Sequence, residues 1–251
     1  MNQVATFYDG HYFRLINSHY QSTRRKYIDF SAFHAFIGRQ TDGIVSEAHF
    51  YKGRLRSDES TEKDFVSQRI FEDVLAKSGI HAHYMDLSWN AEKGIDVSLA
   101  LDAYERAIKG TASIIAIVTG DSDHLPLVRK IKYTSAKTVL LYWNLGSTIR
   151  TSKNLVSEVD RAISMDVLLE NPKMATQILR NMDEPKEAGV IQHVLDGFGF
   201  IAPQQGGPNL YFHRSDLKNY KFDDLSAGMR VAYRTGENAR GVCAKEVHVR
   251  M

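Results

Sequence analysis

The chain has 251 residues, a formal net charge of +2 and a single cysteine, Cys243. That length fits one large or two smaller domains, and the lone cysteine excludes an internal disulfide framework and a cysteine-rich zinc site. The segment after Met1 lacks a basic-then-apolar signal pattern, and no apolar run approaches the roughly 20 residues that a membrane span needs. We therefore expect a cytoplasmic protein with no membrane partner, and leave homo-oligomerisation open.

Strand-like apolar runs alternate with segments of helical spacing over the first two thirds of the chain. This alternation predicts an α/β domain with a parallel, doubly wound central sheet. We predict strands over 4–8, 44–51, 80–85, 113–118 and 138–143, and helices over 12–20, 62–77, 97–108 and 154–162, with a further helix from Leu125 and a short last element over 166–169.

A polar, proline-containing stretch over 182–186 has the composition of a linker. Beyond Gly189 the sequence pattern changes to short predicted strands rich in glycine and aromatic residues, with turn signals at 206–208 and 236–238. This pattern is typical of a small all-β barrel of the OB type. We therefore predict an α/β domain over 1–172, a linker over 173–187 and a barrel over 188–251.

Acidic side chains occupy the predicted strand ends and helix starts of the α/β domain. Asp121 and Asp123 follow the buried run 113–118, Asp9 follows the first strand, and Asp96 begins a long helix. Ligands of such sheets bind beyond the carboxyl ends of the strands, and clustered carboxylates repel each other unless a cation neutralises them. Oxygen ligands favour Mg²⁺ or Mn²⁺. Taken alone, Asp9 is better explained as a turn or helix cap, and Asp96 equally well as a solvated residue at a helix start. Capping explains Asp121 and Asp123 less well, because a cap needs only one of them.

Three short motifs in this region resemble the signatures of NYN domains, the PIN-like nucleases that include LabA-like bacterial proteins. The motifs are Tyr8-Asp9-Gly10, Lys93-Gly94-Ile95-Asp96-Val97 and Thr119 to Val128, and they occur in the family's order and separation. The resemblance implies a Rossmann-like fold, an Mg²⁺ or Mn²⁺ site and ribonuclease activity. Carried over by position, the catalytic and metal-site residues are Asp9, Asp96, Asp121 and Asp123. One position differs from the family's pattern: Tyr12 stands where the family commonly has Asn.

Alternating aromatic residues mark two predicted strands of the barrel. Phe198 and Phe200 share one strand face, as do Tyr211 and His213. Exposed rings on a strand face form a stacking platform for unpaired bases, and Gly199 is expected to leave the two phenylalanine faces uncovered. The alternative is that these rings fill the core of the barrel.

Residues 189–250 resemble a cold-shock domain, an OB-type barrel for single-stranded RNA. Gly-Phe-Gly-Phe-Ile over 197–201 and Leu-Tyr-Phe-His over 210–213 are similar to its two RNA-binding motifs. By position, the resemblance assigns RNA stacking to Phe198, Phe200, Tyr211 and His213. Asp196 replaces the lysine that usually precedes the first motif, which weakens the attraction for phosphate there.

The leading hypothesis is a Mg²⁺- or Mn²⁺-dependent ribonuclease whose barrel binds single-stranded RNA. Lys93, with other basic residues near the site, is expected to hold phosphates. The alternatives are a catalytically silent RNA-binding regulator, which Tyr12 keeps open, and a nuclease for DNA or tRNA or a phosphatase-like activity on nucleotides. A histidine-based metal site at His81 and His83 is disfavoured, because no cysteine partner lies nearby.

Overall fold

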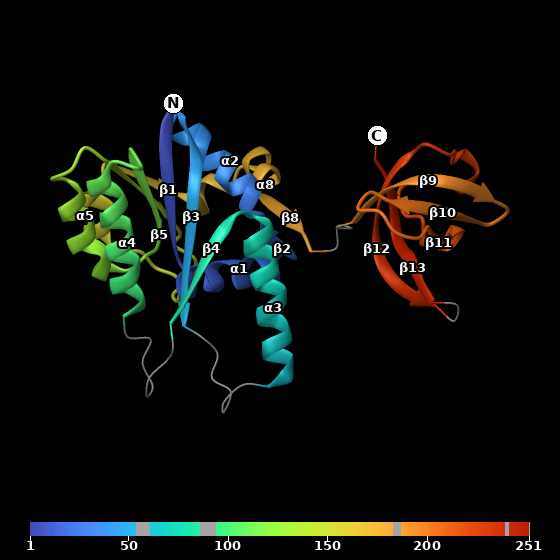
Figure 1. The fold of residues 1–251 in the computed structure, drawn as a ribbon, viewed down its shortest axis with the longest axis horizontal. Coiled ribbons are helices and arrows are strands. Elements are labelled where there is room, and N and C mark those ends of the chain that lie inside the picture. The colour runs from blue at the N-terminus through green and yellow to red at the C-terminus, as the bar shows by residue number, and fades with distance from the viewer. Residues whose placement is uncertain (54–60, 86–93, 183–186, 239–240, 251) are drawn as a thin grey trace. The chain divides into compact units, whose positions relative to one another are not determined.

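The fold comes from a computed structural model, which describes residues 1–53, 61–85, 94–182, 187–238 and 241–250. The chain divides into two compact units, Met1–Met182 and Asp183–Met251 (Figure 1). No helix in the described ranges is both long and apolar enough to cross a membrane.

A six-stranded sheet forms the centre of the first unit, with the order β4-β3-β1-β5-β6-β7 and parallel pairing between all neighbours. The predicted parallel α/β sheet is therefore confirmed. The strands are β1 (Asn2–Asp9), β3 (Gly43–Gly53), β4 (Ile80–Met85), β5 (Ile114–Val118), β6 (Lys137–Tyr142) and β7 (Arg161–Ser164).

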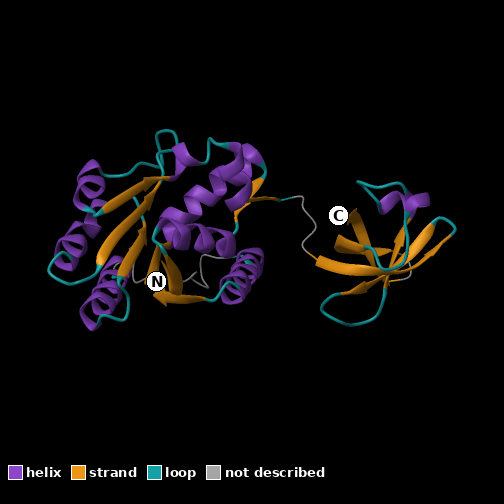
Figure 2. Cartoon of the chain, turned by 90° about the horizontal axis from the view of Figure 1, so that it is seen from above, coloured by secondary structure: helices purple, strands orange, loops and turns teal. Residues whose placement is uncertain are grey.

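Helices cover both faces of the sheet and form a three-layer sandwich (Figure 2). One face packs against α1 (Gly10–Arg24), α2 (Phe30–Gln40), α3 (Glu62–Lys77), α7 (Met165–Leu168) and α8 (Pro172–Ile178). The other face packs against α4 (Ile95–Lys109), α5 (Leu125–Ile131) and α6 (Lys153–Glu158). Strand β5 contributes to both cores and is buried along its whole length, which explains its unbroken apolar sequence.

The strand order reverses between β1 and β5. From β1 the chain builds β3 and β4 on one side, and then crosses to build β5, β6 and β7 on the other. Tyr8 pairs with Val118, so Asp9, the last residue of β1, and Thr119, the first residue after β5, lie at the carboxyl ends of two neighbouring strands. This is the topological switch point, where open α/β sheets bind their ligands.

Two predicted segments differ from the structure in their secondary structure. The helix predicted over 154–162 ends at Glu158, and Arg161–Ser164 form strand β7. Asp160 explains the break, because its Oδ2 accepts hydrogen bonds from the N–H and the hydroxyl of Thr138, each 2.8 Å long, and ties the chain to β6. The segment assigned to the linker over 173–187 contains most of α8 and all of β8 (Leu179–Asn181), which pairs with β2 (Lys26–Ile28). These residues therefore fold with the first unit.

The second unit is a closed barrel, as predicted, and its strands follow the order β10-β11-β13-β12-β9. Its strands are β9 (Glu187–Leu195), β10 (Phe198–Pro203), β11 (Leu210–His213), β12 (Arg230–Asn238) and β13 (Gly241–Val249), and its 3-10 turns are η2 (Arg214–Asp216) and η3 (Phe222–Asp224). The core is lined by inward-facing residues of several strands, among them Ile201, Phe212 and Val231.

Candidate active site and nucleic-acid interface

Asp9 and Thr119 join the carboxyl ends of β1 and β5. The Oδ1 of Asp9 accepts a hydrogen bond from the N–H of Tyr12 at 3.1 Å and so caps α1. Its Oδ2 accepts from the hydroxyl of Thr119 at 3.0 Å. The same hydroxyl oxygen accepts from the N–H of Asp121 at 3.2 Å. Thr119 is fully buried, and it therefore orients two of the predicted site residues at once.

Asp121 caps the short 3-10 turn η1 (Ser122–His124), since its Oδ1 accepts from the N–H of Asp123 at 2.9 Å. Both aspartates are exposed. Capping therefore accounts for one oxygen of Asp121 and leaves its second oxygen without a hydrogen bond within the described part of the chain. The cap and the site are compatible roles for the same carboxylate.

Asp96 lies in the first turn of α4, where its side chain is half exposed. Burial raises the pKa of this carboxyl above its ordinary value, and the negative charges of Asp9, Asp121 and Asp123 raise the pKa further, while His124 opposes them. The Nε2 of His124 lies 3.8 Å from Oδ1 of Asp96. The structure thus brings all four predicted aspartates into one electrostatic cluster, although they belong to three separate segments.

These aspartates offer only carboxylate oxygens, which suits a hard divalent cation. Among the residues that the structure describes, no three His, Cys, Asp or Glu side chains converge closely enough to hold a metal by themselves. Mg²⁺ does not need such a cage, because it keeps several water ligands and is commonly held by one or two carboxylates together with substrate phosphates. The cluster therefore fits Mg²⁺ or Mn²⁺ as an open site.

Tyr12 packs behind the loop that carries Asp121 and Asp123. Its ring packs under Gly120, where an added Cβ would lie 2.7 Å from the ring and 2.6 Å from the carbonyl oxygen of Arg150. Its hydroxyl accepts from the N–H of Trp143 at 2.8 Å and also lies 2.9 Å from the carbonyl oxygen of that residue and 3.1 Å from the Oγ1 of Thr151. Burial raises the pKa of Tyr12 to about 12. The phenol is thus a neutral strut that ties α1 to the end of β6.

Tyr12→Phe should destabilise the first unit by about 1–3 kcal/mol, because the buried N–H and carbonyl of Trp143 lose a partner. Urea unfolding followed by tryptophan fluorescence measures this effect, since the two tryptophans of the chain, Trp89 and Trp143, both precede residue 183 and report on the first unit alone. Unchanged stability would show that the hydroxyl is not a strut.

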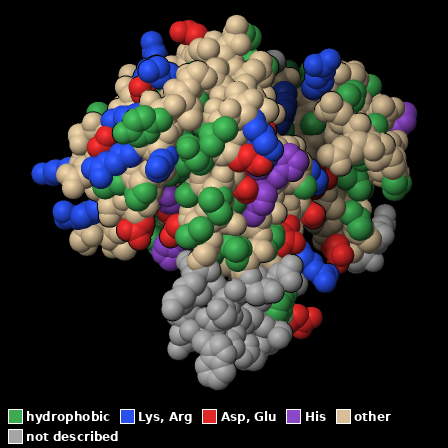
Figure 3. Space-filling model, turned by 60° about the vertical axis from the view of Figure 1, so that its left-hand side comes forward, with side chains coloured by type: hydrophobic (Ala, Val, Ile, Leu, Met, Phe, Trp, Pro, Cys, Tyr) green, Lys and Arg blue, Asp and Glu red, His purple; other side chains and the backbone are tan. Residues whose placement is uncertain are grey.

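A second cluster joins β3 and β4 through histidines. The Nδ1 of His49 lies 3.0 Å from Nε2 of His83, its Nε2 lies 3.0 Å from Oε2 of Glu47, and its ring stacks on His81. Figure 3 shows histidine side chains bordered by acidic ones on the face of the molecule that it displays. Since these nitrogens bond to each other and to Glu47, the cluster connects the two strands.

Lys93, the predicted phosphate contact, lies outside the described residues. The predicted stacking residues all lie on the outer side of the barrel. Phe198, Phe200 and Tyr211 are half-buried, and their ring centroids are 5.6–6.0 Å apart. None of them belongs to the buried core. His213 pairs with Phe198 across the sheet and is exposed, with its Nδ1 2.8 Å from the Oγ of Ser215.

The prediction for Gly199 was wrong. An added Cβ would point inward and lie 2.6 Å from the ring of Phe212 and 2.8 Å from the carbonyl oxygen of His193. The glycine therefore makes room for a core aromatic ring, and strand alternation alone turns Phe198 and Phe200 outward.

The structure adds two residues to the outer face. His193 pairs with Phe200, and Leu195 pairs with Phe198 and is 49% exposed. Sequence reasoning overlooked Leu195, although the Asp196-Gly197 turn carries the signal. A two-residue loop with glycine at positive φ fixes the register of a hairpin, and this register places Leu195 opposite Phe198.

Comparison with known proteins gives two family matches. The NYN domain profile matches residues 3–168, and the "Cold-shock" DNA-binding domain profile matches residues 187–250. Cold shock-like protein CspA of Bordetella pertussis is 31% identical over 65 residues, which span 25% of this chain and 97% of that protein. Cold shock-like protein CspE of Escherichia coli is 35% identical over 51 residues, 20% of this chain and 74% of that protein. A crystal structure of a protein of unknown function from Vibrio parahaemolyticus has 21% identity and a TM-score of 0.48, covering 66% of this chain and 93% of that one.

Proposed function

The chain belongs to the NYN domain family and carries a C-terminal cold-shock domain, and from this premise we propose that it is a Mg²⁺- or Mn²⁺-dependent ribonuclease acting on single-stranded RNA. NYN domains belong to a nuclease superfamily, and cold-shock domains bind nucleic acids. The proposal goes further in naming the metal, the reaction and the substrate, and in assigning metal binding and catalysis to Asp9, Asp96, Asp121 and Asp123.

One observation carries the proposal: at the switch point of the sheet, the carboxylates of Asp9, Asp121 and Asp123 lie close enough to Asp96 for their charges to add to the effect of burial on its pKa. Helix capping alone does not require this convergence, because a cap needs one side-chain oxygen and no second carboxylate. Carboxylates that converge from separate segments are instead typical of a site that a cation completes.

A bound divalent cation would neutralise the charge of the phosphodiester and activate a water molecule. The protein supplies the positions of the ligands. The N–H groups of Tyr12 and Asp123 orient the carboxylates of Asp9 and Asp121, and the Thr119 hydroxyl connects the two. His124 is 1% exposed, so it approaches Asp96 from the protein interior and is not accessible to a substrate in solvent.

The barrel is proposed to bind the same RNA molecule through its outer aromatic face. Tethering two binding sites on one chain converts the second contact into an intramolecular one, and so raises the local concentration of RNA at the cleavage site. Lys93 remains a proposed phosphate contact.

A catalytically silent RNA-binding regulator is the second candidate. The observation in its favour is that the Tyr12 hydroxyl bonds to Trp143 and Thr151, so this position adds no polar group to the aspartate cluster. Labelled single-stranded RNA, incubated with the full chain and Mg²⁺, Mn²⁺ or EDTA, separates the candidates. Metal-dependent cleavage is expected, whereas binding without cleavage would favour the silent regulator. Parallel incubations with single-stranded DNA and tRNA test the broader nuclease alternatives.

The raised pKa of Asp96 has a consequence for stability that needs no activity assay. Because the pKa is higher in the folded state, folding becomes less favourable as the pH rises from the unfolded pKa through the folded one. Asp96→Asn should therefore raise the melting temperature of the metal-free protein at pH 7 and have no such effect at a pH well below both values. Wild type should gain more stability from Mg²⁺ than the variant does. Equal Mg²⁺ stabilisation of the two proteins would contradict the assignment of Asp96.

A further inference from the structure

A pocket of about 340 Å³ opens between α1, α3 and the end of β3. Gly10, the residue after Asp9 in the sequence, is one of its lining residues. Gly10 lets the start of α1 pack closely on β3, because an added Cβ would clash with the carbonyl oxygen of Tyr51 and would lie 2.6 Å from the Phe50 ring. The volume lies at the lower end of the range for small-ligand sites. The lining consists of Gly10, Phe13, Arg14, Asn17, Ser18, Gln21, Phe50, Lys52, Ser67, Gln68 and Phe71.

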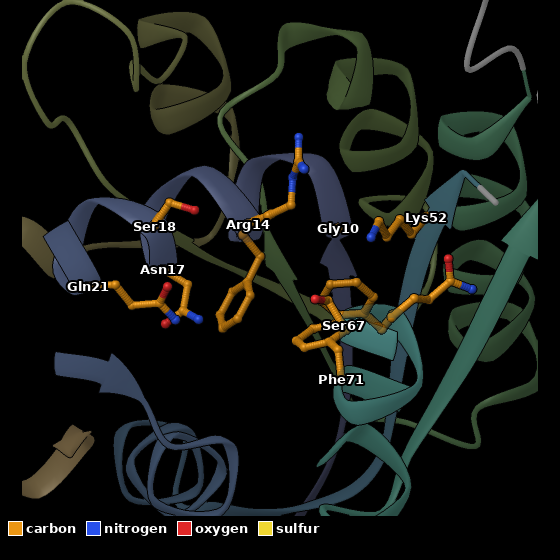
Figure 4. Close-up of a pocket in the computed structure, with 11 residues that line it drawn as sticks. Gly10, Arg14, Asn17, Ser18, Gln21, Lys52, Ser67 and Phe71 are labelled. Atoms are coloured by element: carbon orange, nitrogen blue, oxygen red, sulfur yellow. The ribbon is translucent and has the colours of Figure 1, made fainter. Parts of the chain in front are cut away.

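Helix periodicity explains one wall of this pocket. Arg14, Asn17 and Gln21 follow Gly10 at spacings that place them on one face of α1. They form a polar stripe that runs away from Asp9 along the helix. In Figure 4, Arg14 from α1 and Lys52 from β3 lie along one rim, while Phe71 from α3 lies across the pocket from Arg14.

The chemistry of the lining points to an anion that carries a flat ring. Arg14 and Lys52 are cationic, and the described residues of the lining include no carboxylate. Phe71 is half-buried, with its ring centroid 5.3 Å from that of Phe50, and so offers a supported ring for stacking.

A buried acceptor completes the lining. The Nε2 of Gln68 donates to Oε1 of Glu72 at 2.7 Å. The Oε1 of Gln68 is buried and lacks a hydrogen-bond partner among the described residues. A buried polar atom without a partner is costly, and a ligand N–H would satisfy this one. Nucleobases combine a stacking face with N–H donors on their edges, and the backbone of RNA brings phosphate.

We propose that this pocket binds the nucleotide next to the scissile phosphodiester of single-stranded RNA. Its base stacks on Phe71 and donates to Gln68, and its phosphate contacts Arg14 and Lys52. The proposal rests on the proposed function, because it places the RNA across the aspartate cluster. It adds a second nucleotide-binding position on the first unit, separate from the barrel.

Binding of a fluorescein-labelled tetraadenylate RNA, followed by anisotropy, tests the pocket. The full chain carries Asp121→Asn to prevent cleavage and Phe198→Ala with Phe200→Ala to weaken the barrel. In this background Phe71→Leu, which keeps an apolar side chain, should weaken binding about fivefold or more, since base–aromatic stacking has that magnitude. Arg14→Gln should weaken binding and lower the slope of log affinity against log salt by about 0.7, as expected for one lost phosphate contact on a single strand.

Arg39→Gln is the matched control, because Arg39 does not line the pocket. Arg39 lies on α2 and contacts Gln177, and its neighbour Gly38 packs against Gly43 at the amino end of the sheet. It should bind like the background. The proposal would be overturned if Phe71→Leu and Arg14→Gln keep the melting temperature of the background and bind tetraadenylate as tightly as the background does. Binding of free AMP as tight as that of tetraadenylate would also overturn it, in favour of a mononucleotide site.

Cleavage assays on the same substitutions in an otherwise wild-type chain keep this proposal apart from the proposed function. If the chain cleaves RNA and Phe71→Leu raises KM with little change in kcat, both stand. If the chain cleaves RNA but Phe71→Leu and Arg14→Gln act like wild type, only the pocket proposal fails. If nothing is cleaved while both substitutions weaken tetraadenylate binding, the ribonuclease proposal fails and the pocket remains a nucleotide site.

Discussion

Asp121→Asn should reduce metal-dependent cleavage of single-stranded RNA by at least about 100-fold. Removing a partner of a metal ligand typically reduces metal affinity or activity by about 10–100-fold, and the loss of a ligand charge should have an effect at least that large. Asn keeps an oxygen that can accept from the N–H of Asp123, and Asn caps helices as well as Asp does. The substitution therefore removes the charge and preserves the turn.

The same substitution separates charge from structure through a second measurement. Neutralising Asp121 removes one of the charges that raise the pKa of Asp96, so the metal-free variant should melt no lower than wild type. Asp73→Asn is the matched control, because Asp73 is an exposed carboxylate on α3. It should retain wild-type cleavage. Full cleavage by Asp121→Asn would remove this residue from the site, and a lowered melting temperature would show that it acts mainly as a cap.

The sequence was most informative where one physical requirement dominated. Strand β5 is buried on both faces, and its unbroken apolar run predicted it within one residue. The placement of Asp9 and Asp121 at one edge of the sheet was also predictable, since each lies at the carboxyl end of a strand and parallel strands end at the same edge. In the structure the charges of Asp9, Asp121 and Asp123 act on Asp96, so the four carboxylates lie near one another. Their catalytic and metal-binding roles remain predictions.

Tertiary contacts determined what the sequence did not reveal. Strand β7 follows from the anchoring of Asp160 to Thr138, a contact between residues 22 positions apart. The strut role of Tyr12 depends on Trp143, 131 positions away. The pocket beside Asp9 exists because α3 packs across from α1, and no local pattern signals which helix will face Arg14. Local periodicity predicts elements, but contacts of this kind depend on the folded arrangement.

Phe198→Ala combined with Phe200→Ala should weaken the binding of a long single-stranded RNA by at least about tenfold. Stacking is worth about 1–3 kcal/mol per base, and the two rings lie 6.0 Å apart, so their contributions are not expected to add fully. Two cationic side chains of the barrel are already engaged with carboxylates. Lys245 forms an ion pair with Asp216 at 3.1 Å, and Arg234 forms an ion pair with Glu246 at 2.8 Å.

The control is Phe222→Leu, because Phe222 lies against Phe212 rather than in the outer aromatic face. It should change RNA affinity by less than about twofold. If the barrel acts as a tether, the double variant should raise KM for a long RNA and leave cleavage of a dinucleotide unchanged, because only a long strand reaches both sites. A loss of dinucleotide cleavage would instead mean that the barrel acts on the catalytic unit itself, and unchanged affinity for long RNA would remove the outer aromatic face from RNA binding.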